Sequence, residues 1–441
     1  MPIREACHYD ASGVYVQTHG LPLGSLNTVA ARLNALRQAV MHEAARVCTF
    51  ATSRDDPSGE QAAGSPLSML TWLLMRPSDV LRAYEIHRRQ SELERVLSIA
   101  RVLAEEVDRL VVLGSGVSHA AVAAVFQSCC HPYHNELSPG GRAGGPRLYL
   151  DGHHCDHDAR AAILDLLPQR PSAFKDERWG LIVASAGPQH DATAAALAEY
   201  LPRLRETCRD SEQLARRFMA IARPGDWLHR MAEENALGQP ILLPPNSHMD
   251  SFGPATMLPL AAVGVDVVRY LRGAAAITER FRSTTLGLNP VLDLAGLGHL
   301  LATSKGLTKR IVARESMALA GLELWWQACQ AAIEPACEAN PPGTADATFA
   351  STSAVAARLA SGKPMQIMQL VVESSRRHLG TLPPSIFSAE TQLADAARSA
   401  GLPLVRLLIP RANEACGGQV MQLLPAVALC EQVLQTESKQ G

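Results

Sequence analysis

The sequence predicts an α/β protein with two doubly wound parallel sheets, each in a three-layer αβα arrangement, preceded by a helical N-terminal region. After the first 105 residues, short apolar runs alternate with helical patterns of roughly ten to fifteen residues. The pair Pro244-Pro245 divides this alternation in two. The first 105 residues show helical spacing instead. We therefore expect a helical region at 1–105, α/β subdomains at 106–245 and 246–435, and a polar tail at 436–441.

The composition fits a globular protein with full cores. The chain has 441 residues, of which 47% are hydrophobic and 19% charged, enough for two sizeable domains. A net charge of -2 predicts no nucleic-acid partner and no attraction to an anionic membrane surface. No apolar run reaches the ~18 residues of a spanning helix, and residues 1–20 lack the apolar core of a signal peptide. The ten cysteines form no CxxC pair, so we expect a reduced, cytoplasmic setting.

The individual elements follow from periodicity. In the N-terminal region, three- and four-residue apolar spacing predicts helices at 26–47 and 81–106, around a polar loop at 53–66. In the first subdomain we expect strands at 110–113, 147–150, 180–184 and 240–243, with helices at 120–126, 159–167 and 192–204. In the second we expect strands at 310–313, 365–372 and 404–409, with helices at 255–271, 322–332, 389–400 and 417–435.

One turn organises the first subdomain. An apolar run ends in Gly114-Ser115-Gly116-Val117-Ser118, and an alanine-rich helical stretch follows. Glycine lets an anion approach the main chain, and the start of a helix offers unpaired N–H groups and the positive end of its dipole. The turn therefore predicts a phosphate or a phosphorylated sugar as ligand. Many strand-to-helix turns with two glycines bind nothing, so the turn alone leaves both interpretations open.

A second loop of the same kind strengthens the first. The strand that ends near Ser185 leads into a stretch of small and polar residues, including His190, ahead of the next helix. The carboxyl ends of neighbouring parallel strands meet at one edge of a sheet, and ligands of open α/β sheets bind there. Together the two loops predict a binding site more strongly than either does alone.

The segment from His153 to Asp158 carries two interpretations. Histidine, cysteine and aspartate are zinc ligands. However, the segment directly follows a strand, and Asp156 or Asp158 is well placed to cap the helix that begins near Ala159. Adjacent side chains also seldom converge on one ion. We expect a capped turn with solvated histidines, and we assign no metal and no other cofactor.

Glu334 is the candidate for acid–base chemistry. It lies four residues after Gln330, so both side chains share one helical face. Pro335 disfavours helical geometry at Glu334 and places its carboxylate at a helix end. Without further context, a surface glutamate at a helix terminus is the simpler interpretation.

A collinear series of motifs runs from about residue 105 to residue 435. Its members are the turn 114–118, the strand 181–185, the segment 254–266, Asn289-Pro290, the strand at Ile311, Glu323-Leu324-Trp325-Trp326 and the tail helix 413–434. In this order they resemble the glucose-6-phosphate isomerase (phosphoglucose isomerase) family. Its members have two sugar-isomerase (SIS) type α/β subdomains, as expected here.

The resemblance implies an aldose–ketose isomerase that interconverts glucose 6-phosphate and fructose 6-phosphate through a cis-enediol, as in glycolysis and gluconeogenesis. It also implies a homodimer. By position, Glu334 would move a proton between carbons 1 and 2, Gln330 would lie beside the substrate, and His248 would replace the arginine that stabilises the enediolate. The residues implied in binding the substrate and its phosphate are Gly114, Ser115, Gly116, Ser118, Ser185 and His190.

Departures from the family motifs leave a second function open. Val117 replaces a glycine of the turn, the loop 186–190 lacks the family's lysine and threonines, and 352–356 lacks its histidine. Removing single groups of this kind costs about 10²–10³ in rate. The alternative is a catalytically impaired or inactive descendant that binds a phosphosugar or has a regulatory role.

Overall fold

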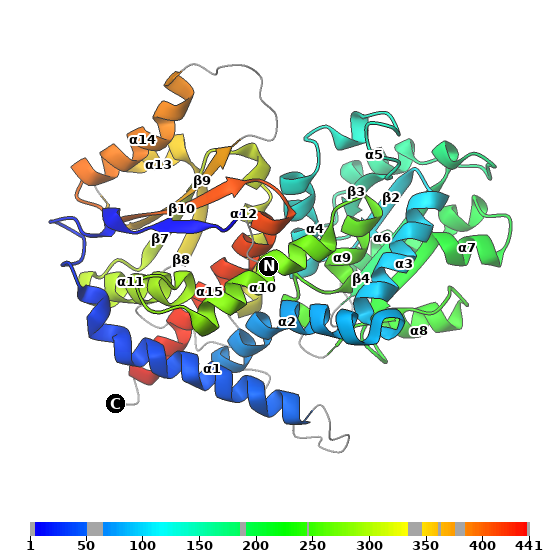
Figure 1. Ribbon diagram of the computed structural model, residues 1–441. Helices are drawn as coiled ribbons and strands as arrows, with labels where there is room; N and C mark the ends of the chain where they lie inside the picture. Colours follow the sequence, from blue (N-terminus) through cyan, green and yellow to red (C-terminus); the bar gives the residue numbers. More distant parts are fainter. Residues whose placement is uncertain are drawn as a thin grey trace. The chain divides into compact units, whose positions relative to one another are not determined.

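The computed structural model describes residues 5–50, 65–185, 191–244, 247–333, 346–359, 363–374 and 384–438. The chain divides into two compact units. The central unit comprises Asp79–Val268 and Leu324–Ala332, and the terminal unit comprises Met1–Ser78, Arg269–Glu323 and Ile333–Gly441. Figure 1 shows that each unit has its own sheet and its own covering helices. The two units are described separately below.

The central unit contains a five-stranded parallel sheet of order β3-β2-β4-β5-β6. Its strands are β2 (Arg109–Leu113), β3 (Arg147–Asp151), β4 (Trp179–Ser185), β5 (Phe218–Ala222) and β6 (Ile241–Leu242). The chain starts at β2, adds β3 on one side and then β4 on the other, so the strand order reverses at β2. This topology confirms the prediction of a doubly wound parallel sheet.

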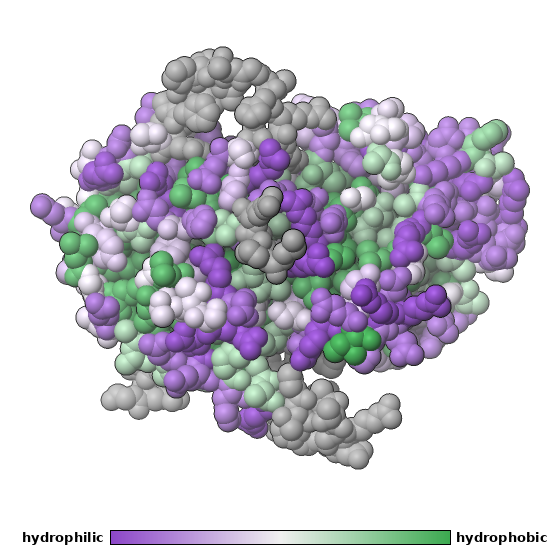
Figure 2. All heavy atoms as spheres, viewed as in Figure 1, coloured by the Kyte–Doolittle hydropathy of each residue, from purple (hydrophilic) through white to green (hydrophobic). Residues whose placement is uncertain are grey.

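Helices cover both faces of the central sheet. One face packs on α5 (His157–Leu166), α6 (Asp191–Glu206), α7 (Ser211–Arg217) and α8 (Trp227–Glu234). Side chains alternate along each strand, so the other face is left for α3 (Glu92–Glu106), α4 (Gly116–Cys129) and α9 (Pro254–Ala262), which contact one another. The outer surfaces of α3 and α7 are mainly hydrophilic in Figure 2, as expected of helices with one face toward solvent.

The terminal unit contains a second five-stranded sheet, of order β1-β10-β9-β7-β8. Strands β7 (Lys309–Arg314), β8 (Asp346–Ser351), β9 (Gln366–Ser374) and β10 (Leu404–Arg411) are parallel, and β1 (His8–Asp10) pairs antiparallel with β10. The remaining helices are α1 (Ala30–Phe50), α2 (Pro66–His87), α10 (Val267–Ser283), α11 (Pro290–Lys305), α12 (Leu322–Ile333), α13 (Thr352–Leu359), α14 (Pro384–Ser399) and α15 (Glu414–Ser438). The second predicted parallel sheet is therefore also confirmed.

Several features differ from the sequence-based expectations. The helix expected at 81–106 is the end of α2 and all of α3, which are separated by a short 3-10 helix, Arg88–Gln90. The region 1–105 is not purely helical, because β1 gains main-chain hydrogen bonds by pairing with β10. The region is also divided between the two units, after Ser78. The helix expected at 255–271 is two helices, α9 and α10. Gly264 separates them with φ of 92°, a left-handed conformation that a glycine adopts readily and that ends a helix.

Helices α10 and α15 of the terminal unit meet backbone to backbone. A Cβ atom at Gly273 would lie 2.1 Å from the carbonyl oxygen of Ala415, and one at Gly418 would lie 2.0 Å from that of Tyr270. Neither position has room for any side chain. Among the described residues, we find no helix that is both long and apolar enough to traverse a bilayer.

Candidate functional site

The turn after β2 is built by its two neighbouring strands. Leu113, the last residue of β2, pairs with Asp151 of β3 and with Val183 of β4. Gly114 donates its N–H to the Asp151 carbonyl at 3.2 Å, and a Cβ on Gly114 would lie 3.2 Å from the Ala184 carbonyl oxygen. Only a residue without a side chain fits comfortably between these two strand ends.

The helix expected after the turn begins at Gly116, with Ser115 as its N-cap residue. Gly116 is exposed and has φ of 73°, which favours glycine. Ser115 makes no side-chain capping hydrogen bond. The first-turn N–H groups have no partner within the helix, so the exposed start of α4 can receive an anion. Val117 points into the apolar core and is 2% exposed.

Ser185 lies at the same edge of the sheet. It is the last residue of β4, directly beside β2, and its Oγ accepts a hydrogen bond from Trp227 Nε1 at 3.1 Å. The predicted neighbourhood of the two loops at one edge is therefore present up to Ser185. His190 and the rest of the loop, 186–190, lie outside the described residues.

His119 is the feature that sequence reasoning missed. It is 6% exposed in the first turns of α4, and neither ring nitrogen has a hydrogen-bond partner among the described residues. A Cβ on Gly114 would lie 3.3 Å from His119 Nδ1, so the imidazole lies directly against the glycine turn. Burial, with a smaller contribution from His153, lowers the pKa of His119 to about 3. The side chain is therefore neutral at physiological pH.

A buried ion pair fixes the end of β3 beside this histidine. Asp151 is 1% exposed, and its Oδ2 accepts hydrogen bonds from Arg160 Nε at 3.0 Å and Tyr200 OH at 3.1 Å. Its Oδ1 accepts the Gly152 N–H at 2.6 Å. Arg160 also bonds Glu199 at 3.1 Å. The charge of Arg160 is thus neutralised within the protein, which makes this pair a structural support of the turn.

The segment from His153 to Asp158 forms the capped turn that was expected. Asp156 is the N-cap of α5, and its Oδ1 accepts the Ala159 N–H at 3.0 Å. His154 Nδ1 accepts the Asp156 N–H at 3.3 Å. In the part of the chain that the structure describes, no cluster of three or more His, Cys, Asp or Glu side chains is arranged to hold a metal ion.

The remaining predicted residues are placed only in part. Gln330 is half-buried on α12, in the stretch of that helix that belongs to the central unit. In the same stretch, Trp325 is fully buried and donates from Nε1 to Ser251 Oγ at 2.9 Å. His248 lies in a short 3-10 helix, Ser247–Met249, of which the backbone is described. Glu334 lies outside the described residues.

Solved structures with the same arrangement define the class of fold. A hypothetical protein from Thermus thermophilus superimposes with a TM-score of 0.71 at 16% identity, over 97% of this chain and 94% of that one. A glucose-6-phosphate isomerase from Chlamydia trachomatis gives a TM-score of 0.62 at 13% identity, over 82% of this chain and 74% of that one. The chain thus has the two-sheet α/β fold of a glucose-6-phosphate isomerase.

Curated relatives carry the same name. Glucose-6-phosphate isomerase of Alkaliphilus metalliredigens is 24% identical over 273 residues, which is 60% of this chain and 56% of the relative. That of Symbiobacterium thermophilum is 26% identical over 243 residues, 54% of this chain and 51% of the relative. The chain spans about half the length of these curated relatives, and no family model matches it. The resemblance predicted from the motifs is confirmed at this level of similarity.

Proposed function

We propose that the protein is a sugar-phosphate aldose–ketose isomerase that interconverts glucose 6-phosphate and fructose 6-phosphate. The observation that carries the proposal is the geometry at the carboxyl edge of the central sheet. The exposed start of α4 and the hydroxyl of Ser185 follow neighbouring strands at the point where the strand order reverses, which is where ligands of open α/β sheets bind. The curated relatives carry this activity in their names.

In this proposal the phosphate binds to main-chain N–H groups at the start of α4, with Ser115, Ser118 and Ser185 as hydroxyl donors. The helix dipole favours the negative charge there. Of the described arginines near this edge, Arg160 is already paired with Asp151 and Glu199, whereas Arg223 directly follows Ala222, the strand partner of Ser185. Arg160 is therefore not available to the phosphate, and the proposed contacts are N–H groups and hydroxyls.

Glu334 is proposed as the base. Its carboxylate takes the proton from carbon 2 of the open-chain aldose, and the electrons of that C–H bond form the C1–C2 double bond as the aldehyde oxygen gains a proton. The resulting cis-enediol then loses its carbon 2 hydroxyl proton and receives a proton at carbon 1, which gives the ketose. Gln330 lies beside the substrate, and His248 donates to the developing enediolate oxygen.

The second candidate is a descendant that binds a phosphosugar without turnover. The replacement of glycine by Val117 and the absence of lysine and threonine from 186–190 favour it. Both candidates predict that glucose 6-phosphate raises the melting temperature.

We further propose a homodimer in the cytoplasm. Sedimentation as a monomer at micromolar concentration would contradict the dimer.

The test is a coupled assay of fructose 6-phosphate conversion by native protein, Glu334→Gln and Glu315→Gln. Glu315 is an exposed glutamate, so the last variant controls for the loss of one negative charge. We expect native turnover, a loss of about 10²-fold or more in Glu334→Gln, and no change in Glu315→Gln.

The remaining outcomes separate the candidates. No native turnover together with stabilisation by glucose 6-phosphate would select the binding descendant. If the protein shows no turnover and is not stabilised by glucose 6-phosphate, both candidates are rejected. Native turnover that survives Glu334→Gln would keep the isomerase and reject Glu334 as its base.

A further inference from the structure

The terminal unit contains a cavity of about 400 Å³ that the proposed isomerase chemistry does not use. It lies among β1, the α10–α11 corner and the first turns of α11. Its lining includes Tyr9, Tyr15, Leu26, Arg280, Leu288 and Asp293. Small-molecule pockets are typically 300–1,000 Å³, so the cavity has room for a small metabolite.

Hydrogen bonds hold the floor of the cavity together. Asp293 is 1% exposed, and its carboxylate accepts hydrogen bonds from the N–H groups of Gly287 and Asn289 at 3.0 and 2.8 Å. It also accepts the hydroxyl proton of Tyr9 at 2.5 Å. Asp293 thereby accepts three hydrogen bonds and holds the Tyr9 ring in place. A ligand would find these groups already ordered, which reduces the entropic cost of binding.

Arg280 is the arginine that lines this cavity, together with the carboxylates of Asp293 and of Asp10, which is paired with Arg406. It belongs to the last turn of α10 and is half-buried, and its Nη1 donates to the Cys7 carbonyl at 2.7 Å. It pairs with no carboxylate among the residues that the structure describes. Guanidinium stays charged at neutral pH and presents five N–H donors in a planar fork. A half-buried, tethered guanidinium of this kind can bind a carboxylate or phosphate group.

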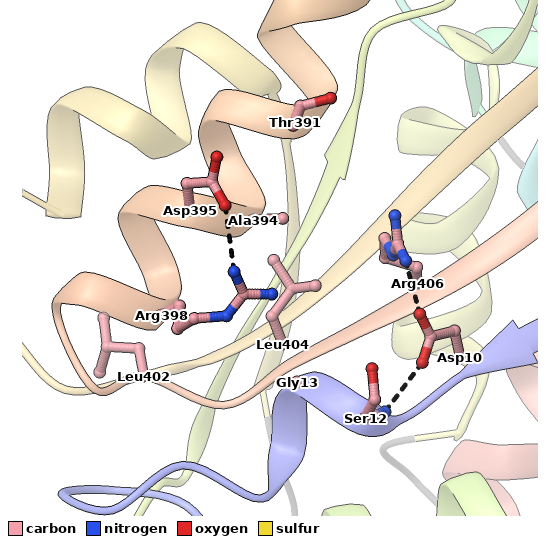
Figure 3. Close-up of a pocket in the computed structure, with 10 residues that line it drawn as sticks. All are labelled: Asp10, Ser12, Gly13, Thr391, Ala394, Asp395, Arg398, Leu402, Leu404 and Arg406. Atoms are coloured by element: carbon pink, nitrogen blue, oxygen red, sulfur yellow. Dashed lines mark hydrogen bonds and ion pairs between the residues drawn. The ribbon is translucent and has the colours of Figure 1, made fainter.

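In a neighbouring pocket, the arginines are paired with carboxylates (Figure 3). This pocket of about 130 Å³ also contains arginines. Arg406 pairs there with Asp10 at 2.6 Å, and Arg398 pairs with Asp395 at 3.2 Å. Both guanidinium groups are paired with a carboxylate, so this pocket attracts an anion only weakly. The contrast singles out Arg280.

We propose that the cavity around Arg280 binds a small organic anion, with the carboxylate or phosphate group on Arg280 and the apolar part against Leu26 and Leu288. This site lies within the terminal unit and shares no residue with the phosphosugar site proposed above. The apolar side chains that accompany the guanidinium favour an organic anion over inorganic phosphate.

Isothermal titration calorimetry with benzoate, phenyl phosphate and neutral benzamide tests the site. We expect at least one of the anions to bind with a dissociation constant of about 1 mM or lower, and benzamide to bind at least about tenfold more weakly. Arg280→Gln should weaken anion binding about tenfold or more. Benzoate and phenyl phosphate distinguish a carboxylate site from a phosphate site.

A second pair of variants covers the case in which Arg280→Gln does not fold. Leu288 is 66% exposed at the cavity rim, so Leu288→Glu adds a repulsive charge with little risk to folding, and Leu288→Gln controls for the loss of the apolar chain. We expect Leu288→Glu to bind the anion more weakly than Leu288→Gln. Gly116→Ala, in the central unit, should leave this binding intact.

Three results would overturn the proposal. They are no saturable heat with either anion up to about 10 mM, equal binding by Leu288→Glu and Leu288→Gln, or anion binding lost in Gly116→Ala but kept in Arg280→Gln. The last result would place the bound anion at the phosphosugar site instead.

Discussion

The imidazole rings of His119 and His153 lie with their centroids 5.1 Å apart. His119 is buried against the glycine turn at Gly114, whereas His153 is exposed. The pair thus joins the first turns of α4 to the segment after β3. A proton on the buried ring would have no hydrogen-bond acceptor among the described residues, and this has a measurable effect on stability.

We expect the free energy of unfolding to decrease as the pH is lowered, because of His119. Its pKa is about 3 in the folded protein, against about 6.5 in an unfolded chain. Between these values the unfolded state binds a proton that the folded state does not. Acidification therefore favours unfolding, by about 1.4 kcal/mol per pH unit. Urea denaturation of native protein and His119→Asn at pH 7.5 and pH 5 measures the effect.

The difference in stability between native protein and His119→Asn should narrow by about 2 kcal/mol from pH 7.5 to pH 5. The variant keeps part of the pH dependence, because burial also lowers the pKa of His299 to about 4. An unchanged difference at the two pH values would contradict the burial of His119.

We expect Gly116→Ala to destabilise the protein by about 1 kcal/mol, because alanine is strained at φ of 73°. The space around this position is otherwise open, with no atom within 4 Å of the added Cβ. Gly140 is the matched control, since its Cβ would also be free and its φ lies outside the left-handed region. Gly140→Ala should change stability by less than about 0.5 kcal/mol. Urea denaturation distinguishes the two.

The same variant also tests the phosphosugar site. The added methyl group would project into the space in front of the start of α4, so glucose 6-phosphate should raise the melting temperature of Gly116→Ala less than that of Gly140→Ala. Equal rises would place the phosphosugar elsewhere.

Asn289→Ala should cost about 3 kcal/mol, because this fully buried amide joins two helices. Its Oδ1 caps α11 by accepting the Leu292 N–H at 3.1 Å, and its Nδ2 donates to three carbonyls at the end of α10, each at 3.1 Å. The N-cap of α7, Asp210, accepts one capping bond, from Gln213 at 2.8 Å. Asp210→Ala should therefore cost about 1 kcal/mol. Similar losses in the two variants would refute the bridging role of Asn289.

The sequence predicted the strands whose own residues have a high strand propensity. Leu110–Leu113 and Leu404–Ile409 are rich in branched apolar residues, and both appear as strands at the expected places. Phe218–Ala222 and Asp346–Ser351 were missed, since methionine, alanine and aspartate favour strands weakly. The three-residue strand His8–Asp10 forms only because β10 supplies its partner. Pairing between distant segments leaves no trace in local periodicity.

The candidate site divides in the same way. The meeting of the Gly114 turn and Ser185 at one edge followed from the rule that parallel strands share their carboxyl ends. The burial of His119 did not, because it depends on packing against Gly114 and on a ring from the segment after β3. In the sequence, His119 is one polar residue in an alanine-rich helix, and nothing local distinguishes it from a solvated side chain.

The terminal unit is assembled from three stretches of chain, and this sets the order in which the protein can fold during synthesis. Strand β1 pairs with β10, and the Cys7 N–H donates to Gln419 on α15. The first residues of the unit therefore cannot form these contacts until its last residues have been synthesised. The central unit, apart from Leu324–Ala332, is complete by Val268. Until α11 and α15 emerge from the ribosome, α1 lacks both of these partners for its apolar face at Leu33, Leu36 and Val40. The incomplete terminal unit therefore leaves apolar surface uncovered until these late helices are made, a state in which aggregation competes with folding.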